Sequence, residues 1–249
     1  MSIPLPGTGP VFGIWAHPDD EVYLSGGLMA AARAAGRRVV CVTATRGEHG
    51  TDDPERWPPE RLAAIRDAEL TASLAALGVT EHHQLGLPDG NCVRQPFDAV
   101  VARLAGIVAE VRPEVVLTFG PDGFTGHPDH RMVSAWAEAA RNRAAPNARL
   151  LFARVTAEFA DTWRHLYDRL GMFASDDLPW RAAPDRVAVR LRLDDAAADR
   201  KLVALRAQAS QTAQLTALLG EETMRAWACS VETFVDAVPA QALDFADGC

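Results

Sequence analysis

The stretch VFGIWAHPDDE, residues 11–21, decides how this chain folds and points to its chemistry. Its first six residues are an apolar run typical of a buried β-strand. The strand leads directly into His17, Asp19 and Asp20. Imidazole nitrogen and carboxylate oxygen are the ligand atoms of a catalytic Zn²⁺, which typically takes three from the protein and leaves one position for water. One of the two neighbouring carboxylates can bind a metal and the other can act as a base, so the sequence predicts a metal-assisted hydrolase.

A second cluster, GHPDH at residues 126–130, repeats this arrangement in the middle of the chain. It follows the apolar run 115–119, which also reads as a buried strand. His127 and His130 lie three residues apart at a helix start and therefore share one face. Asp129 lies where its carboxylate can hydrogen-bond a ring nitrogen, fix the tautomer and raise the pKa of that imidazole.

We expect one divalent ion per chain, held by residues of both clusters. Its ligands would be His17, Asp20 and His130, while Asp19 stays free and His127 reaches the substrate. This donor set suits Zn²⁺, and Fe²⁺ or Co²⁺ could substitute for it. Glu21 is left out of the ligand set, because a carboxylate at this position opens the following helix or braces the turn.

Short apolar runs alternate with helical patterns over the first two thirds of the chain. Strands are expected at 11–16, 38–44, 82–87 and 115–119, and helices at about 25–35, 59–77, 96–111 and 127–143. This alternation predicts right-handed βαβ units, and hence a Rossmann-like α/β fold whose mostly parallel sheet has helices on both faces.

The two clusters follow the first and the fourth strand. In a doubly wound sheet of order 3-2-1-4-5 these strands are neighbours, and ligands bind outside the carboxyl ends of strands at such a switch point. Residues more than a hundred positions apart in the sequence would therefore meet in one crevice.

The pattern loosens after residue 150. Strands are expected at 150–155 and 187–193, and helical stretches at about 159–170, 195–212 and 220–234. We interpret residues 1–249 as one domain, with a core of about 11–155 and a small C-terminal elaboration of about 156–249.

The composition narrows the partners and the compartment. A net charge of −8 argues against a nucleic-acid surface, which would need a basic stripe. The sequence shows neither a signal peptide nor an apolar run long enough to span a membrane. Its four cysteines have no regular spacing, as in a reduced cytoplasmic protein. The partner would be a small molecule, and a homo-oligomer is left open.

AHPDDE after a first strand and GHPDH after a fourth resemble the PIG-L/LmbE-like deacetylases, zinc-dependent enzymes that remove acetyl from N-acetylglucosamine-type substrates. The resemblance covers roughly residues 11–135 well and the C-terminal third poorly. Three weaker stretches agree with it: Thr45-Arg46-Gly47-Glu48, then Arg66-x-x-Glu69-Leu70, and Lys201-x-x-Ala204-Leu205 with Ser210-Gln211.

The resemblance also implies roles for single residues. Zinc would be held by His17, Asp20 and His130. Asp19 would be the general base, and His127 the general acid or oxyanion partner. Arg66 would contact substrate hydroxyls, for which a guanidinium offers a fixed fork of donors. One departure is Gln208, at a position where the family often has histidine.

These observations predict a zinc-dependent hydrolase that removes an acyl group, in the first place acetyl, from the nitrogen of an amino-sugar or glycoconjugate. An amidase acting on a thiol-sugar conjugate or another non-sugar amide is the alternative. A non-catalytic metal-containing binding protein is a further one. A dinucleotide-binding oxidoreductase would need G-x-G-x-x-G after the first strand, where HPDD stands instead.

Overall fold

The apolar run that opens the sequence forms β1, which lies in the interior of the sheet between β2 and β4. We describe a computed structural model that covers residues 2–171 and 181–237. Its sheet has eight strands in the order β3-β2-β1-β4-β5-β8-β7, with β6 paired to β5 beside this path. The strands are β1 Val11–Trp15, β2 Val39–Thr45, β3 Glu81–Leu87, β4 Val115–Thr118, β5 Arg149–Thr156, β6 Arg181–Ala182, β7 Val187–Arg192 and β8 Val231–Asp236.

Strands β1 to β5 pair with one another in parallel, and helices link each to the next. The helices are α1 Asp20–Ala34, α2 Pro59–Ala76, α3 Phe97–Val111, α4 Pro128–Ala144, α5 Ala157–Leu170, α6 Asp195–Ala207, α7 Ala209–Leu219 and α8 Glu221–Ala228, with short 3₁₀ turns at Cys92–Arg94 and Pro184–Arg186. The Rossmann-like α/β class and the strand order 3-2-1-4-5 are thereby confirmed.

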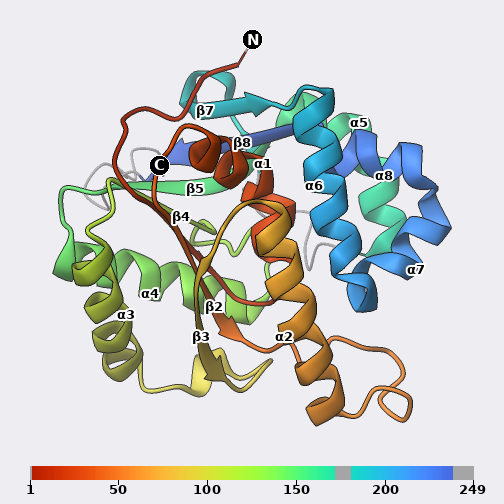
Figure 1. Ribbon diagram of the computed structural model, residues 1–249, viewed down its shortest axis with the longest axis horizontal. Helices are drawn as coiled ribbons and strands as arrows, with labels where there is room; N and C mark the ends of the chain where they lie inside the picture. Colours follow the sequence, from red (N-terminus) through yellow and green to blue (C-terminus); the bar gives the residue numbers. More distant parts are fainter. Residues whose placement is uncertain (1, 172–180, 238–249) are drawn as a thin grey trace, which may run out of the picture.

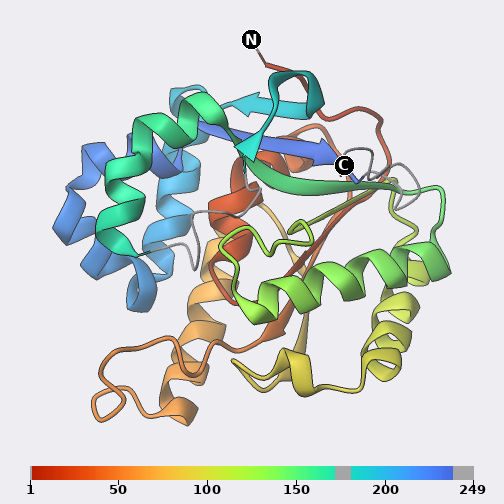
Figure 2. The same cartoon turned by 180° about the vertical axis from the view of Figure 1, so that it is seen from behind.

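Helices cover both faces of the sheet, as Figures 1 and 2 show from opposite sides. Helices α3 and α4 pack together on one face, while α1 and α2 lie on the other with α6 against them. Strands β1, β2 and β4 consist of apolar residues and threonine and are buried along their whole length, as expected for strands covered on both sides.

Three expected boundaries were wrong. The helix expected at about 25–35 begins at Asp20, directly after the turn that carries His17. The stretch expected as one helix over 195–212 is divided at Gln208 into α6 and α7. The helix expected over 220–234 ends at Ala228, and Val231–Asp236 form strand β8.

The error at β8 has a physical reason. The segment is rich in β-branched and aromatic residues, which pack well in a strand. It pairs antiparallel with β5 on one side and β7 on the other, so the strand is stabilised by partners that the local pattern does not show. The C-terminal third therefore extends the same sheet. No helix among residues 2–171 and 181–237 is long and apolar enough to cross a membrane.

Candidate active site at the carboxyl ends of strands β1 and β4

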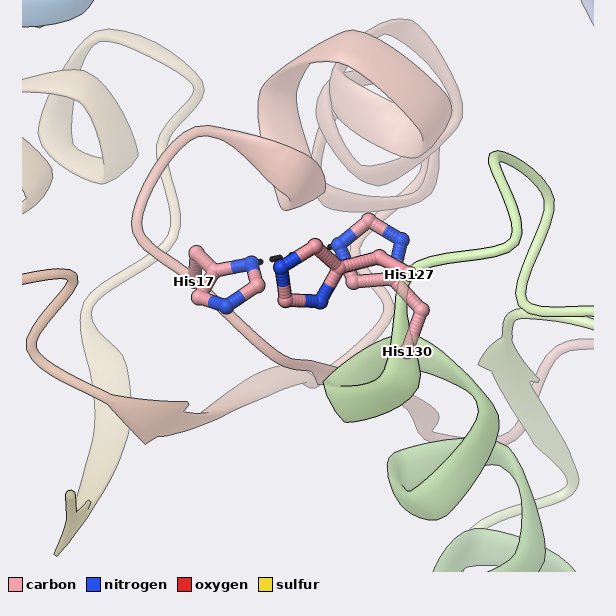
Figure 3. Close-up of side chains that lie close together, drawn as sticks. All are labelled: His17, His127 and His130. Atoms are coloured by element: carbon pink, nitrogen blue, oxygen red, sulfur yellow. Dashed lines mark hydrogen bonds between the residues drawn. The ribbon is translucent and has the colours of Figure 1, made fainter. Parts of the chain in front are cut away.

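Two loops meet where β1 and β4 end. The two strands are paired in parallel, so the turn after β1 and the loop after β4 leave the same edge of the sheet. The first carries His17, and the second leads to His127 and His130 at the start of α4. The Nδ1 atom of His17 lies 3.1 Å from the Nε2 atom of His130, although 113 residues separate them (Figure 3).

The carboxylate of Asp20 lies beside both of these ring nitrogens. One oxygen lies 3.5 Å from His17 Nδ1 and the other 3.4 Å from His130 Nε2. Zinc binds such ligands at about 2.0–2.1 Å, and the edge of the resulting tetrahedron is about 3.3 Å. The separation of the two ring nitrogens is close to this edge, and the carboxylate has one oxygen beside each nitrogen, so the three side chains could hold a zinc-sized ion after a small rotation of the Asp20 carboxylate.

Two further groups of possible metal ligands include the imidazole ring of His17. The ring nitrogens of His17, His127 and His130 all lie within 4.8 Å of one another, and so do one nitrogen of His17 and carboxylate oxygens of Asp89 and Asp129. His17 belongs to both groupings. The structure therefore places all the expected ligands in one cluster and adds Asp89 to it.

The second nitrogen of His17 faces two carboxylates. Its Nε2 atom lies 3.1 Å from an Asp89 oxygen and 3.4 Å from an Asp129 oxygen. Burial lowers the pKa of His17, but hydrogen bonds to Asp129, Asp20 and Asp89 outweigh it and raise this pKa well above its ordinary value. A carboxylate behind a histidine ligand fixes the ring orientation and makes the ligand more basic. The ring nitrogen that Asp129 was expected to hydrogen-bond is therefore Nε2 of His17.

Asp129 is itself held firmly. It is fully buried and accepts hydrogen bonds from the backbone N–H groups of Gly90, at 2.8 Å, and Cys92, at 3.0 Å. These donors follow β3, so a third loop at the same sheet edge joins the site. Sequence reasoning missed Asp89 in this loop. The signal was the Pro88-Asp89-Gly90 turn directly after the third strand, at the edge where the other clusters lie.

His130 is positioned by its own loop. Its Nδ1 atom lies 3.0 Å from the carbonyl oxygen of Gly123, and the Phe119 ring stacks on the imidazole with centroids 4.1 Å apart. Burial lowers the pKa of His130 to about 4. The ring is therefore neutral at pH 7, and with Nδ1 donating to Gly123 it presents the Nε2 lone pair to a metal.

His127 caps helix α4. Its Nδ1 atom accepts a hydrogen bond of 3.2 Å from the backbone N–H of Asp129. The proton of the neutral ring therefore sits on Nε2, which can donate. Burial, followed by the charge of His17, lowers the pKa of His127.

Asp19 occupies a constrained position between the ligands. Its φ of 106° is in the region that side chains other than glycine rarely adopt. The backbone N–H donates to Glu21 at 2.9 Å, and the side chain lies 3.4 Å from Arg66. Burial raises the pKa of Asp19 to about 7, against the lowering effect of Arg66. A carboxylate with a pKa near the working pH suits a general base.

Arg66 lies at the site and is 3% exposed. Its guanidinium donates to the carbonyl oxygens of Gly47, at 2.9 Å, and Pro18, besides facing Asp19. It therefore ties the turn after β1 to the loop after β2. The substrate contact expected of it stays a prediction.

Glu21 stabilises the turn after β1. One carboxylate oxygen accepts the N–H of Asp19, and the other accepts the side-chain amide of Gln208 at 2.6 Å. Both side chains are fully buried, and burial raises the pKa of Glu21 to about 8. Gln208 thus holds Glu21 rather than lining an open surface, which links the C-terminal third to the turn after β1.

Comparison with known proteins agrees with this geometry. Residues 13–141 match the family model of GlcNAc-PI de-N-acetylases, PIG-L. The chain is 34% identical over 224 residues to a 1D-myo-inositol 2-acetamido-2-deoxy-alpha-D-glucopyranoside deacetylase of Mycobacterium sp. (strain JLS), covering 80% of this chain and 72% of that protein. A protein of the same description from Acidothermus cellulolyticus is 33% identical over 234 residues, covering 80% of this chain and 78% of its own.

Solved structures share the fold. The N,N'-diacetylchitobiose deacetylase from Pyrococcus horikoshii superposes with a TM-score of 0.64 and 24% identity, over 92% of this chain and 83% of that one. GalB, the 4-carboxy-2-hydroxymuconate hydratase from Pseudomonas putida KT2440, gives a TM-score of 0.63 at 17% identity, over 93% and 97%. One fold therefore serves different reactions, and the reaction has to be argued from the site.

Proposed function

Because the chain belongs to the PIG-L family of GlcNAc-PI de-N-acetylases, we propose that it is a zinc-dependent hydrolase that removes an acyl group, in the first place acetyl, from the nitrogen of an amino-sugar. The observation that carries the proposal is the cluster of His17, Asp20 and His130 side chains, with separations of 3.1–3.5 Å among their nitrogen and oxygen atoms, beside an Asp19 whose pKa is raised to about 7. The substrate class rests on the relatives, which are described as deacetylases of an acetamido-glucopyranoside.

His17, Asp20 and His130 would hold one Zn²⁺ per chain, and Fe²⁺ or Co²⁺ could replace it because the donors are nitrogen and oxygen. When bound, such an ion polarises an acyl carbonyl and lowers the pKa of a coordinated water toward about 7. Asp129 supports this set by accepting from His17 on the side away from His130.

The remaining chemistry is proton transfer by two residues. Asp19 accepts a proton from the water that attacks the carbonyl carbon, held in place by Glu21 and Arg66. His127 donates a hydrogen bond from Nε2 to the developing oxyanion and then gives this proton to the leaving amine nitrogen, while the proton that Asp19 took from water returns to the His127 ring, so that both residues end in their starting protonation states. Each positioned acid or base of this kind contributes about 10²–10⁴ in rate.

Arg66 is proposed as the residue on the substrate-binding side. Its guanidinium already holds two backbone carbonyls, so a sugar hydroxyl would have to approach the edge that faces Asp19. The amide of a thiol-sugar conjugate, or an amide without a sugar, could bind at the same site. Both therefore stay alternative substrates.

We also propose a cytoplasmic, reducing setting. Within the described residues Cys41, Cys92 and Cys229 are buried and form no disulfide, as is usual where thiols stay reduced. The partner would be a small N-acylated molecule rather than a nucleic acid, given the net charge of −8.

The proposal is tested by metal analysis combined with amine release. Purified protein should contain one equivalent of divalent metal and release amine from at least one member of a panel of N-acetyl amino-sugars. Chelation should abolish the release, and Zn²⁺ should restore it. A full equivalent of metal without amide hydrolysis on sugar or non-sugar amides would favour the binding-protein alternative.

A further inference from the structure

An apolar pocket of about 140 Å³ adjoins the metal-binding side chains. Its inner end is formed by Asp20 and His130 together with Thr125. Aromatic rings from three helices line the rest, namely Tyr23 of α1, Phe159 and Tyr167 of α5, and Trp227 of α8. Nothing in the chemistry described above uses these rings.

The charged groups in the pocket wall are already paired. Arg154 lies 2.9 Å from Asp122. Glu232 accepts from Lys201 and from the backbone N–H of Gly27, both at 2.7 Å. A polar ligand entering the pocket would break these pairs or bury its own groups without partners, which costs free energy. An apolar ligand instead binds with a favourable free energy, because its apolar surface is removed from water.

The site dictates which part of an amide substrate faces the pocket. A carbonyl carbon bound there carries two substituents, the amine nitrogen and the acyl chain. The nitrogen must lie within reach of His127, which protonates it. The residues on that side, His127, Asp19 and Arg66, do not line the pocket, whereas Asp20 and His130 do. The acyl chain therefore extends toward the aromatic rings.

We infer that this pocket binds the acyl chain, and that the enzyme acts on amides of straight-chain acyl groups longer than acetyl in preference to acetyl itself. The inference rests on the proposed amide hydrolysis and changes one part of it, because it replaces acetyl with a longer acyl chain as the preferred group. The substrate class that it names is an amine acylated by a medium-length fatty acid. The chain of such a fatty acid would not fit into a space beside the metal that is only as large as an acetyl group.

Binding tests the pocket independently of turnover. Acetate, butanoate, hexanoate and octanoate are titrated into the metal-loaded enzyme by calorimetry, with the fluorescence of Trp227 as a second signal. A fully buried methylene adds about fourfold in affinity, and a partly buried one adds less. With about twofold for each of the six extra methylenes, octanoate should bind on the order of a hundredfold more tightly than acetate.

Turnover is compared on N-acetyl, N-butanoyl, N-hexanoyl and N-octanoyl glucosamine. The kcat/KM should rise from acetyl to hexanoyl. Ala228→Leu fills the pocket from α8, where Ala228 is buried, and should lower the hexanoyl-to-acetyl ratio at least tenfold. Ala226→Leu is the matched control, because Ala226 lies on the same helix but is exposed and outside the pocket lining. Phe159→Ala widens the pocket and should shift the preference to octanoyl, whether or not Ala228→Leu folds.

The outcomes separate the two proposals. Hydrolysis of N-acetylglucosamine with acid affinities that do not change with chain length would overturn the acyl-chain inference and leave the deacetylase proposal standing. Chain-length-dependent binding, lost in Ala228→Leu, without hydrolysis of any amide would overturn the proposed reaction and support the apolar ligand site.

Discussion

At the scale of single residues, the turn after β1 combines two adjacent carboxylates, Asp19 and Asp20, in different environments. Burial raises the pKa of Asp19 to about 7, whereas the charge of His130 and hydrogen bonds to His17 lower the pKa of Asp20 to about 2 despite the same burial. Two adjacent carboxyl groups whose pKa values are pushed apart mark an acid–base assignment. Asp20 is the permanent anion suited to a metal, and Asp19 is the group that can exchange a proton near neutral pH.

The first prediction separates these two aspartates. Asp19→Asn should retain a full equivalent of metal and lose about 10²–10⁴ in kcat, with a smaller change in KM, because only proton transfer is removed. Asp20→Ala should lose metal and activity together. Metal content measured beside steady-state kinetics checks both, and near-normal turnover by Asp19→Asn would assign the base to another residue.

A second prediction concerns Arg66, which holds Pro18 and Gly47 and faces Asp19. Arg66→Ala should raise KM for a sugar amide more than for a minimal acetamide if the guanidinium holds sugar hydroxyls. It should also lower the thermal stability, since two buried carbonyls lose their donor, at about 1–3 kcal/mol for each unsatisfied group. Equal kinetic losses on both substrates would leave Arg66 a purely positioning role.

At the scale of elements, α1 matters most, because it begins at Asp20, directly after Asp19, and so positions both carboxylates of the proposed site. A buried ion pair between Lys201 and Glu232 hydrogen-bonds to the backbone in the middle of this helix. Glu232 of β8 accepts the N–H groups of Gly27 and Leu28, each at 2.7 Å, and Lys201 of α6 donates to the carbonyl of Tyr23 at 2.8 Å. The C-terminal third thus holds α1 in register with the sheet.

The third prediction tests how much this ion pair stabilises the fold. Lys201→Met should destabilise the fold by about 3–5 kcal/mol, because it leaves the fully enclosed Glu232 without its counter-charge. Urea unfolding followed by circular dichroism measures the loss. Arg206→Met, on the same helix but in an exposed pair with Glu221, is the control and should change stability by less than about 1 kcal/mol. Similar losses in both variants would contradict a special role for the buried pair.

Local patterns predicted the elements of the first two thirds, and beyond them β7 and the start of α6, but they missed the division at Gln208 and strand β8. In the βαβ part, each strand and helix is visible as its own periodic run, so the order 3-2-1-4-5 followed from general rules. Strand β8 depends on pairing with β5, about eighty residues earlier in the sequence. The pair of Lys201 and Glu232 acts on a helix over 170 residues away, and no periodicity reveals such a contact.

At the scale of the whole molecule, the site is a product of topology. The convergence of His17, Asp20 and His130 was predictable because adjacent strands at a switch point bring their loops together. Asp89 was not foreseen, since its loop follows a weak strand and its role depends on the position of the His17 ring. We propose that residues 1–249 form one domain, because β8 and β7 extend the sheet of the first part.

The fourth prediction follows from this topology. A metal that binds only the folded protein stabilises it by about 2.7 kcal/mol at a hundred times its Kd. For a chain of this length, removing the metal should lower the Tm by about 5–10 °C. Scanning calorimetry with and without a chelator measures the shift. His130→Ala should show no such dependence, and an unchanged Tm in the chelated native protein would contradict the metal site.

The separation of His17 from His130 by 113 residues has a consequence for biosynthesis. At ordinary translation speeds the second histidine leaves the ribosome roughly 6–20 s after the first. During that interval the nascent chain carries only the His17 part of the proposed metal site. If the two histidines share a metal as proposed, it can be captured only after β4 has docked against β1. A truncated chain released before that point would then not be rescued by any supply of zinc.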